Sequence, residues 1–440
     1  MLNKPLLSIG WCLACMVTHS ALLSAQVVTE IVDMNTLGAG LLEGPEGVAV
    51  DSLGNVYVVG SVSNNLVKIT PGGIASELLS HATPGIEFLL PWGVAVDDAD
   101  NVYASAFGSN RVYKIEAGTP SVILDNVGTG LNGPRGVAVD ASGNVFVVGH
   151  VSGNLLKVTP GGAVSEVITP NPLGPMSMTT PYGVAVDMAG NAFVACNGSD
   201  NVLKVTPGGT VSEIIDSTGA GPGFSLNGAY DVATDSMGNV FVACNGSSNV
   251  FRITPVGGIT EIMGVCDGLC TGHMVTVDNF DVVYVSGNSS HNVLRRPPGG
   301  ETSEVISASG DGMTNPLSGA FGVATDTQGN VYVAGKNSDN VFRIDLAPIA
   351  FQRGDLNATG NTDVGDAIVV LDYLFNGGPA TCLDAMDWNN SESVTLTDAF
   401  QMLCYLFCVP NTPPPPDPFG TCGFELDLDA LGCDVQPAGC

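Results

Sequence analysis

One short pattern recurs seven times along this chain and limits what the chain can fold into. Its first copy is GVAVDSLGNVYVV at residues 47–59, and an aspartate stands at the same place in every copy. The copies are 43 to 48 residues apart, a period typical of folds built from one repeated supersecondary unit. The seven aspartates are Asp51, Asp97, Asp140, Asp187, Asp235, Asp278 and Asp326.

Each copy predicts four short β-strands. In the first copy they are GVAV, VYVV, NLVKIT and ASELL, which are apolar runs separated by Gly, Pro, Asn and Asp. Four strands in each unit of this length indicate a propeller blade. The seventh copy lacks a fourth strand, and TEIVD at residues 29–33 supplies one. We therefore predict an all-β fold, a seven-bladed β-propeller that the N-terminal strand closes.

The pattern GVAVDSLGNVYVV…NLVKITPGG resembles the NHL repeat, a β-propeller family. The resemblance covers roughly residues 27–346, and we place the propeller domain at residues 26–349. It implies the fold but no single function, because such propellers include binding proteins, lyases and lactonases.

A basic residue stands 17 positions after every repeat aspartate, and these seven residues are more than half of the 13 basic residues in the chain. We expect each to take part in a structural ion pair or a turn-capping network within its blade. The seven residues are Lys68, Lys114, Lys157, Lys204, Arg252, Arg295 and Arg343.

A functional site is expected where the sevenfold symmetry is broken. The residue before each GVAV-like segment begins the innermost strand, near the mouth of the central channel, and it differs between blades. Such a ring could bind a small ligand or a peptide side chain, or its members could simply fill the channel and pack on one another. The ring consists of Glu46, Trp92, Arg135, Tyr182, Tyr230, His273 and Phe321.

An enzymatic site at the same mouth is the alternative hypothesis. A lyase or a lactonase-type hydrolase would use His273, Glu46 and Arg135. A zinc lyase would need several axial histidines, whereas only His273 is placed there. A lactonase-like calcium site would need an axial set of Glu, Asn and Asp, for which Glu46 and Asp231 are the candidates. This comparison favours a non-catalytic binding or scaffold protein.

Composition limits the compartment and the partners. Residues 1–25 carry one Lys, an apolar run and then small residues, which predicts a secretory signal cleaved after Ala25. No later apolar run is long enough to span a bilayer, so we expect a secreted, extracellular or cell-surface protein. The net charge of −30 argues against nucleic acid as a partner.

A second module is predicted at residues 350–408, where a loop and a helix occur twice. In the first copy, oxygen donors occupy calcium-loop positions 1, 3, 5, 9 and 12, with Gly360 at the sharp turn. The duplication resembles the dockerin type I module, an EF-hand-like calcium binder, and this resemblance implies Ca²⁺ and a cohesin-like protein partner. The predicted ligands are Asp355, Asn357, Thr359, Asp363, Asp366, Asp387, Asn389, Ser391 and Asp398.

The two loops depart from the pattern to different degrees. In the second loop Glu392 replaces the glycine and Thr395 replaces an acid, so we expect the first loop to bind calcium better than the second. Residues 409–440 begin with a proline run, and six cysteines lie between Cys382 and the C-terminus. In an exported chain these predict a disulfide-stabilised tail. Taken together, the sequence predicts a propeller that binds a protein, peptide or glycan and a module that attaches it.

Overall fold

A computed structural model describes residues 27–32, 42–169, 176–312, 315–346, 350–351, 367–371, 374, 394, 396–407 and 423–424. The chain divides into two compact units, a propeller unit and a second unit made of Leu346–Cys440 with the short segments Asn279–Val282 and Arg296–Thr302. We call Leu346–Cys440 the C-terminal unit. In the propeller unit, the described residues form seven four-stranded antiparallel sheets.

The four strand positions of the blades have the following bounds. The innermost strands are β2 (Pro45–Val50), β6 (Pro91–Val96), β10 (Pro134–Val139), β14 (Pro181–Val186), β18 (Ala229–Thr234), β22 (Gly272–Val277) and β26 (Ala320–Thr325). The second strands are β3 (Val56–Gly60), β7 (Val102–Ala106), β11 (Val145–Gly149), β15 (Ala192–Cys196), β19 (Val240–Cys244), β23 (Val283–Gly287) and β27 (Val331–Gly335). The third strands are β4 (Asn65–Ile69), β8 (Arg111–Glu116), β12 (Asn154–Val158), β16 (Asn201–Val205), β20 (Asn249–Ile253), β24 (Asn292–Arg296) and β28 (Asn340–Asp345). The outermost strands are β5 (Ala75–Ser80), β9 (Thr119–Leu124), β13 (Val164–Ile168), β17 (Val211–Ile215), β21 (Ile259–Met263), β25 (Ser303–Ile306) and β1 (Val27–Val32).

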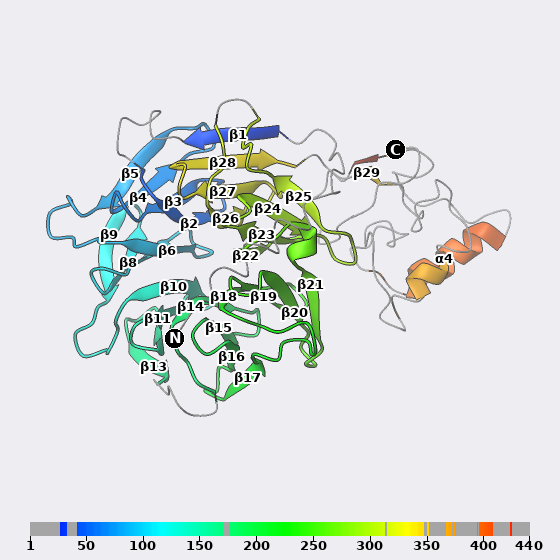
Figure 1. The fold of residues 1–440 in the computed structure, drawn as a ribbon, viewed down its shortest axis with the longest axis horizontal. Coiled ribbons are helices and arrows are strands. Elements are labelled where there is room, and N and C mark those ends of the chain that lie inside the picture. Colours follow the sequence, from blue (N-terminus) through cyan, green and yellow to red (C-terminus); the bar gives the residue numbers. More distant parts are fainter. Residues whose placement is uncertain are drawn as a thin grey trace. The chain divides into compact units, whose positions relative to one another are not determined.

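The blades follow one another around a common axis in sequence order. Each innermost strand contacts the innermost strands of the two neighbouring blades, and β26 contacts β2 to complete the circle. Figure 1 shows the innermost strands at the centre of the propeller and the outermost strands at its rim. The seven-bladed β-propeller predicted from the repeat is therefore confirmed.

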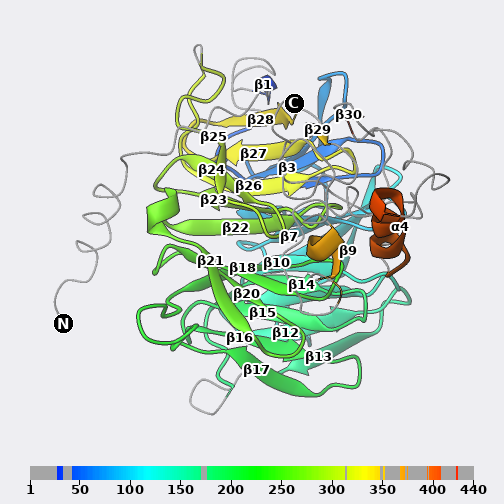
Figure 2. The same cartoon turned by 90° about the vertical axis from the view of Figure 1, so that its right-hand side faces the viewer.

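The N-terminal strand closes the ring, as predicted. The fourth strand of blade 7 is β1, which pairs antiparallel with β28, with Val28 opposite Ile344. Asn340 adds a hydrogen bond of 3.0 Å from its Nδ2 to Glu30 Oε1, between residues 310 positions apart. In both views β1, drawn in blue, lies beside β28, drawn in yellow (Figures 1 and 2).

The core lies between neighbouring sheets. The cluster between blades 4 and 5 contains Phe193 and Phe251, whose side chains are almost fully buried. The innermost strands approach one another even more closely. A Cβ atom on Gly136 would lie 2.6 Å from the Tyr182 carbonyl oxygen, and one on Gly47 would lie 2.6 Å from the Trp92 carbonyl oxygen. The glycine of the GVAV segment is therefore required because the next blade's backbone fills the space of a side chain.

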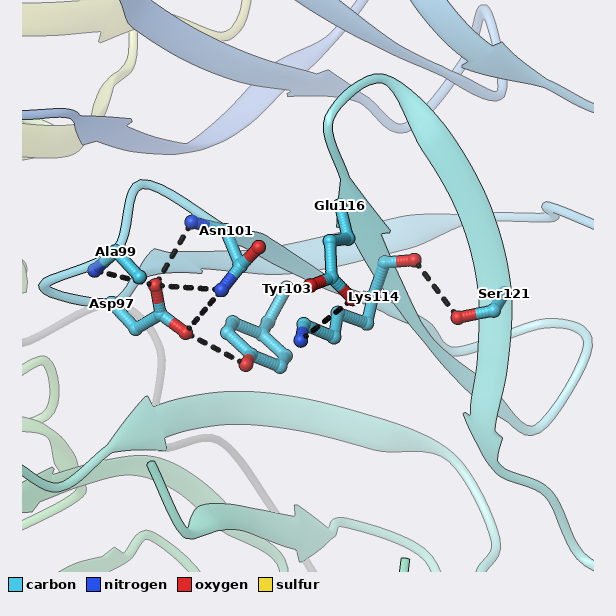
Figure 3. A network of polar contacts seen from close by, with 7 residues as sticks. All are labelled: Asp97, Ala99, Asn101, Tyr103, Lys114, Glu116 and Ser121. Atoms are coloured by element: carbon cyan, nitrogen blue, oxygen red, sulfur yellow. Dashed lines mark hydrogen bonds and ion pairs between the residues drawn. The ribbon is translucent and has the colours of Figure 1, made fainter. Parts of the chain in front are cut away.

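The repeat aspartate caps the turn between the first and second strands. In blade 2, Asp97 accepts hydrogen bonds from the backbone N–H groups of Ala99 and Asn101, from Asn101 Nδ2 and from the Tyr103 hydroxyl (Figure 3). Burial raises the pKa of Asp97, but these hydrogen bonds outweigh it and hold the pKa below its usual range. This carboxylate therefore stabilises the fold above the ordinary aspartate pKa, and its contribution is lost as the pH falls.

The repeat cation does not pair with the repeat aspartate in this blade. Within the described part of the chain, no ion pair joins Lys114 to Asp97, and Lys114 Nζ instead lies 3.1 Å from Glu116 Oε2 on its own strand (Figure 3). In blade 1, Lys68 Nζ lies 5.5 Å from the centre of the Tyr57 ring. The repeat aspartate therefore caps its turn without the repeat cation, because neutral donors already satisfy it. The predicted ion pair within the blade occurs in blade 2, but its partner is Glu116 and not the repeat aspartate.

The C-terminal unit is described in short segments. Residues 367–371 are helical, and α4 spans Leu396–Phe407, so helices occur where both loop-helix copies predict them. Ala367 and Ala399 occupy equivalent places in the two copies and both are buried, whereas the equivalent Ile368 and Phe400 are exposed. A two-stranded pairing joins β29 (Ala350–Phe351) to β30 (Gly423–Phe424). None of the helices in the described segments is long and apolar enough to cross a membrane.

Candidate functional site

The ring residues predicted from the broken symmetry meet at one end of the propeller axis. Trp92 and Phe321 lie 5.4 Å apart between ring centres although they come from blades 2 and 7, which are not neighbours. Tyr230 of blade 5 also contacts Phe321, at 6.2 Å. The side chains therefore touch across the axis, and we call the seven ring residues together with Phe107, His150 and Lys336 the mouth cluster.

Arg135 lies among the aromatic rings of the mouth cluster. Its guanidinium carbon is 3.8 Å from the centre of the Trp92 ring, 4.1 Å from that of Tyr182 and 5.1 Å from that of Phe107. Contacts of this kind contribute about 0.5 to 2 kcal/mol each, depending on exposure. Arg135 Nε is buried and has no hydrogen-bond partner, and the residue as a whole stays partly exposed.

Glu46 forms an ion pair that crosses from blade 1 to blade 7. Lys336 Nζ lies 2.7 Å from Glu46 Oε1. The Glu46 side chain is almost fully buried, and its second oxygen has no hydrogen-bond partner. Burial raises the pKa of Glu46, and the charge of Lys336 opposes this rise. The carboxylate of the predicted enzymatic set is therefore tied to a lysine and is not exposed to solvent.

His273, the predicted catalytic histidine, is enclosed by aromatic rings. It stacks on Tyr230 at 4.3 Å with an interplanar angle of 14°, and Phe321 meets it edge-on at 4.5 Å. Its Nδ1 atom is buried without a hydrogen-bond partner. Burial and the charge of Lys336 lower the pKa of His273 to about 3, so the ring is neutral at physiological pH.

Three members of the mouth cluster were missed in the sequence. Phe107, His150 and Lys336 each follow the last residue of a second strand, where blades 4 to 6 carry asparagine. His150 Nδ1 is 3.1 Å from the Pro181 carbonyl oxygen, and burial and the nearby Arg135 lower its pKa to about 4. Comparing this loop position across the seven copies, as was done for the ring, would have found all three.

Asp231 is the second departure from symmetry at the axis. It stands where five other blades have the glycine of the GVAV segment. Its Oδ2 accepts a hydrogen bond of 3.0 Å from the Val275 N–H in the next blade, and its carboxylate occupies the space beside Gly183 in the preceding blade. Burial raises the pKa of Asp231 to about 7. Asp231 thus connects three innermost strands, and it does not join Glu46 in a calcium site.

The predicted calcium ligands fall almost entirely outside the described residues. The exception is Asp398, whose side chain is buried in the first turn of α4. Among the described residues, no group of three or more His, Cys, Asp or Glu side chains is arranged to hold a metal ion. The predicted signal segment and most of the cysteine-rich tail also lie outside the described residues.

Comparison with solved structures identifies the propeller. A streptogramin B lyase structure aligns with a TM-score of 0.60 and 16% identity over 73% of this chain and 98% of the other. Virginiamycin B lyase from Staphylococcus aureus aligns with a TM-score of 0.59 and 16% identity, over 73% of this chain and all of the other. Neither protein-family models nor curated proteins give a match to the sequence. At 16% identity the similarity shows the fold alone: the repeat region of this chain has the seven-bladed β-propeller fold of those lyases.

Proposed function

We propose that this protein is an exported, non-catalytic binding or scaffold protein. Its propeller binds a protein, peptide or glycan partner at the mouth cluster, and its C-terminal module mediates calcium-dependent attachment or assembly. The observation that carries the proposal is the meeting of the blade-specific residues in one partly exposed cluster. Aromatic and arginine side chains that lie together on a surface are typical of binding sites.

The environment of the ionisable groups supports binding over acid–base catalysis. A general base works best when its pKa lies near the working pH. The pKa of His273 is about 3, and its ring is covered by Tyr230 and Phe321. Glu46 is buried against Lys336. The mouth cluster therefore offers rings and cations for recognition, while its proton-transfer groups are enclosed.

Replacing Trp92 with alanine is expected to weaken partner binding at least tenfold. The Trp92 ring contacts Arg135, Lys336 and Phe321, so truncation removes its contacts with three members of the mouth cluster. The full chain is first screened on peptide and glycan arrays, and the affinity of the best binder is then measured for the wild type and for Trp92→Ala.

Met188→Ala serves as the control for that experiment. Met188 is 87% exposed and follows β14, at the opposite end of that strand from Tyr182. The control should bind like the wild type. Equal affinities for wild type and Trp92→Ala, with unchanged melting temperatures, would rule out the mouth cluster as the binding site.

The calcium part of the proposal is supported by the duplicated loop sequence and by the helices that follow both loops. Titration calorimetry of the full chain with Ca²⁺ is expected to show saturable binding that Asp355→Ala removes from the first loop. Asp355 provides position 1 of a loop whose ligands are hard oxygen donors. Asp387→Ala is the matched variant in the second loop and should have the smaller effect. Absence of saturable binding in the wild type would refute a calcium module.

A further inference from the structure

We propose that the mouth cluster recognises a carboxylate group of an acidic peptide and that Arg135 is the residue that binds it. The inference rests on the proposed binding function and adds to it the chemistry of the ligand. Arg135 is the cation of the mouth cluster that makes no contact ion pair with a carboxylate among the described residues.

The guanidinium of Arg135 is positioned but not hydrogen-bonded. Trp92, Tyr182 and Phe107 surround it, and its Nε is buried without a hydrogen-bond partner. No hydrogen bond or ion pair to its side chain occurs within the described part of the chain. Arginine has five N–H donors in one plane, and these match the two oxygens of a carboxylate. Because the rings already fix the side chain, less conformational entropy is lost when a ligand binds.

Arg135 has no ion pair among the described residues of this strongly acidic chain. The sequence has 43 acidic residues against 13 basic ones, so a protein carboxylate could easily have been placed beside it. Lys336, the other cation of the mouth cluster, has Glu46 at 2.7 Å. Arg111 of blade 2 has Glu87 at 2.7 Å. The charge of Arg135 also acts on the Glu46 carboxylate, but the contact partner of Glu46 is Lys336. The partly exposed guanidinium of Arg135 therefore makes no contact ion pair among the described residues, which favours an anionic ligand group.

The packing of the rings favours a peptide over a sugar. A sugar ring binds aromatic residues by laying its C–H face on an open aromatic face. In the mouth cluster, Tyr230 stacks on His273, and Tyr182 contacts Arg135, His150 and Tyr230. With these faces occupied, recognition rests on the partly exposed guanidinium of Arg135, which suits an acidic side chain or a terminal carboxylate.

Trp92 provides a spectroscopic probe for the test. The chain has three tryptophans, and Trp11 lies in the predicted signal segment. Trp388→Phe therefore leaves Trp92 as the single emitter in the exported protein. Its ring centre is 3.8 Å from the Arg135 guanidinium, so a carboxylate that binds there should change its fluorescence. The probes are acetyl-(Gly-Glu)₃-amide, acetyl-(Gly-Gln)₃-amide and trigalacturonate. The titrations are done at about 0.15 M salt, where interactions between exposed charges more than roughly 8 Å apart are largely screened. The net charge of the protein then has little effect on the peptide, whereas a direct ion pair is retained.

The glutamyl peptide is expected to give a saturable change, and the glutaminyl peptide should bind at least tenfold more weakly. Arg135→Gln should lower the affinity for the glutamyl peptide at least tenfold, and Arg135→Lys should restore only part of it because lysine lacks the planar fork. Lys157→Gln is the control, because it removes one positive charge from the same blade. The Lys157 ammonium group lies over the ring of Phe146.

Equal binding of both peptides would overturn the carboxylate inference and leave the mouth as a peptide-binding site. Binding of trigalacturonate alone would overturn the peptide assignment. An unchanged affinity in Arg135→Gln, or no response to any probe, would overturn the role of Arg135, whereas the array experiment with Trp92→Ala tests the proposed binding function independently.

Discussion

Asp231→Asn is expected to make the propeller more stable at pH 8 than the wild type, with no difference at pH 3. Burial raises the pKa of Asp231 from 3.8 to about 7 in the folded protein. The stability associated with the protonated carboxyl is present below pH 4 and is lost as the pH rises through 7. A shift of this size corresponds to roughly 4 kcal/mol at full effect. Because the residue keeps partial exposure, we expect a gain of about 2 kcal/mol at pH 8.

The measurement is the free energy of unfolding of both proteins from denaturant titrations between pH 3 and pH 8. Asparagine keeps an oxygen that can accept the Val275 N–H, so the comparison isolates the charge. The pKa values of His273 and His150, about 3 and 4, lie in the lowest part of this range, and both histidines are present in both proteins, so their effects cancel in the difference. A difference in stability that does not change with pH would contradict a buried, charged Asp231.

Asp51→Ala is expected to destabilise the protein by about 3 to 5 kcal/mol, because hydrogen bonds to a buried charged group are strong and removing the acceptor leaves its donors unsatisfied. Asp51 is almost fully buried and accepts hydrogen bonds from the N–H groups of Leu53 and Asn55, from Asn55 Nδ2 and from the Tyr57 hydroxyl. The measurement is equilibrium unfolding at neutral pH.

Asp187→Ala is the matched comparison in blade 4. Asp187 accepts hydrogen bonds from the backbone N–H and from the Nδ2 of Asn191, and blade 4 has Phe193 where blade 1 has Tyr57. It is also more exposed than Asp51. We expect a loss of about 1 to 2 kcal/mol there. Similar losses of unfolding free energy at both positions would show that the hydrogen bond from Tyr57 and the burial of Asp51 do not contribute to stability.

The propeller could be predicted because its signals are local and repeated. The sequence of each blade predicts its own strands and turns. With seven copies, the shared pattern is clear even where one copy departs from it. The missing fourth strand in blade 7 also left only one place from which a closing strand could come, and β1 occupies it. The ring at the mouth followed from the same logic, because a position near the axis is shared by all blades.

What the sequence could not provide was the choice among possible partners. Asp51 and Lys68 stand at fixed separation, which suggested an ion pair, yet Asn55 and Tyr57 satisfy the aspartate first. Lys336 was unnoticed because its loop looked like an ordinary polar turn, although it neutralises Glu46. Pairing of charges depends on which side chains from different blades lie close together in the folded protein. The spacing of residues along the sequence does not give the distances between their side chains.

The closing strand has a consequence for how the chain reaches its folded state. Blade 7 combines the first and the last strands of the propeller, and contacts over such a separation in sequence form slowly because a long segment must be brought back on itself. Six blades can assemble as an open arc before this happens, with the backbone groups of β28 unpaired along its edge. Blade 7 therefore needs both ends of the propeller sequence, and a chain without β1 would retain an edge at β28 open to pairing with another molecule.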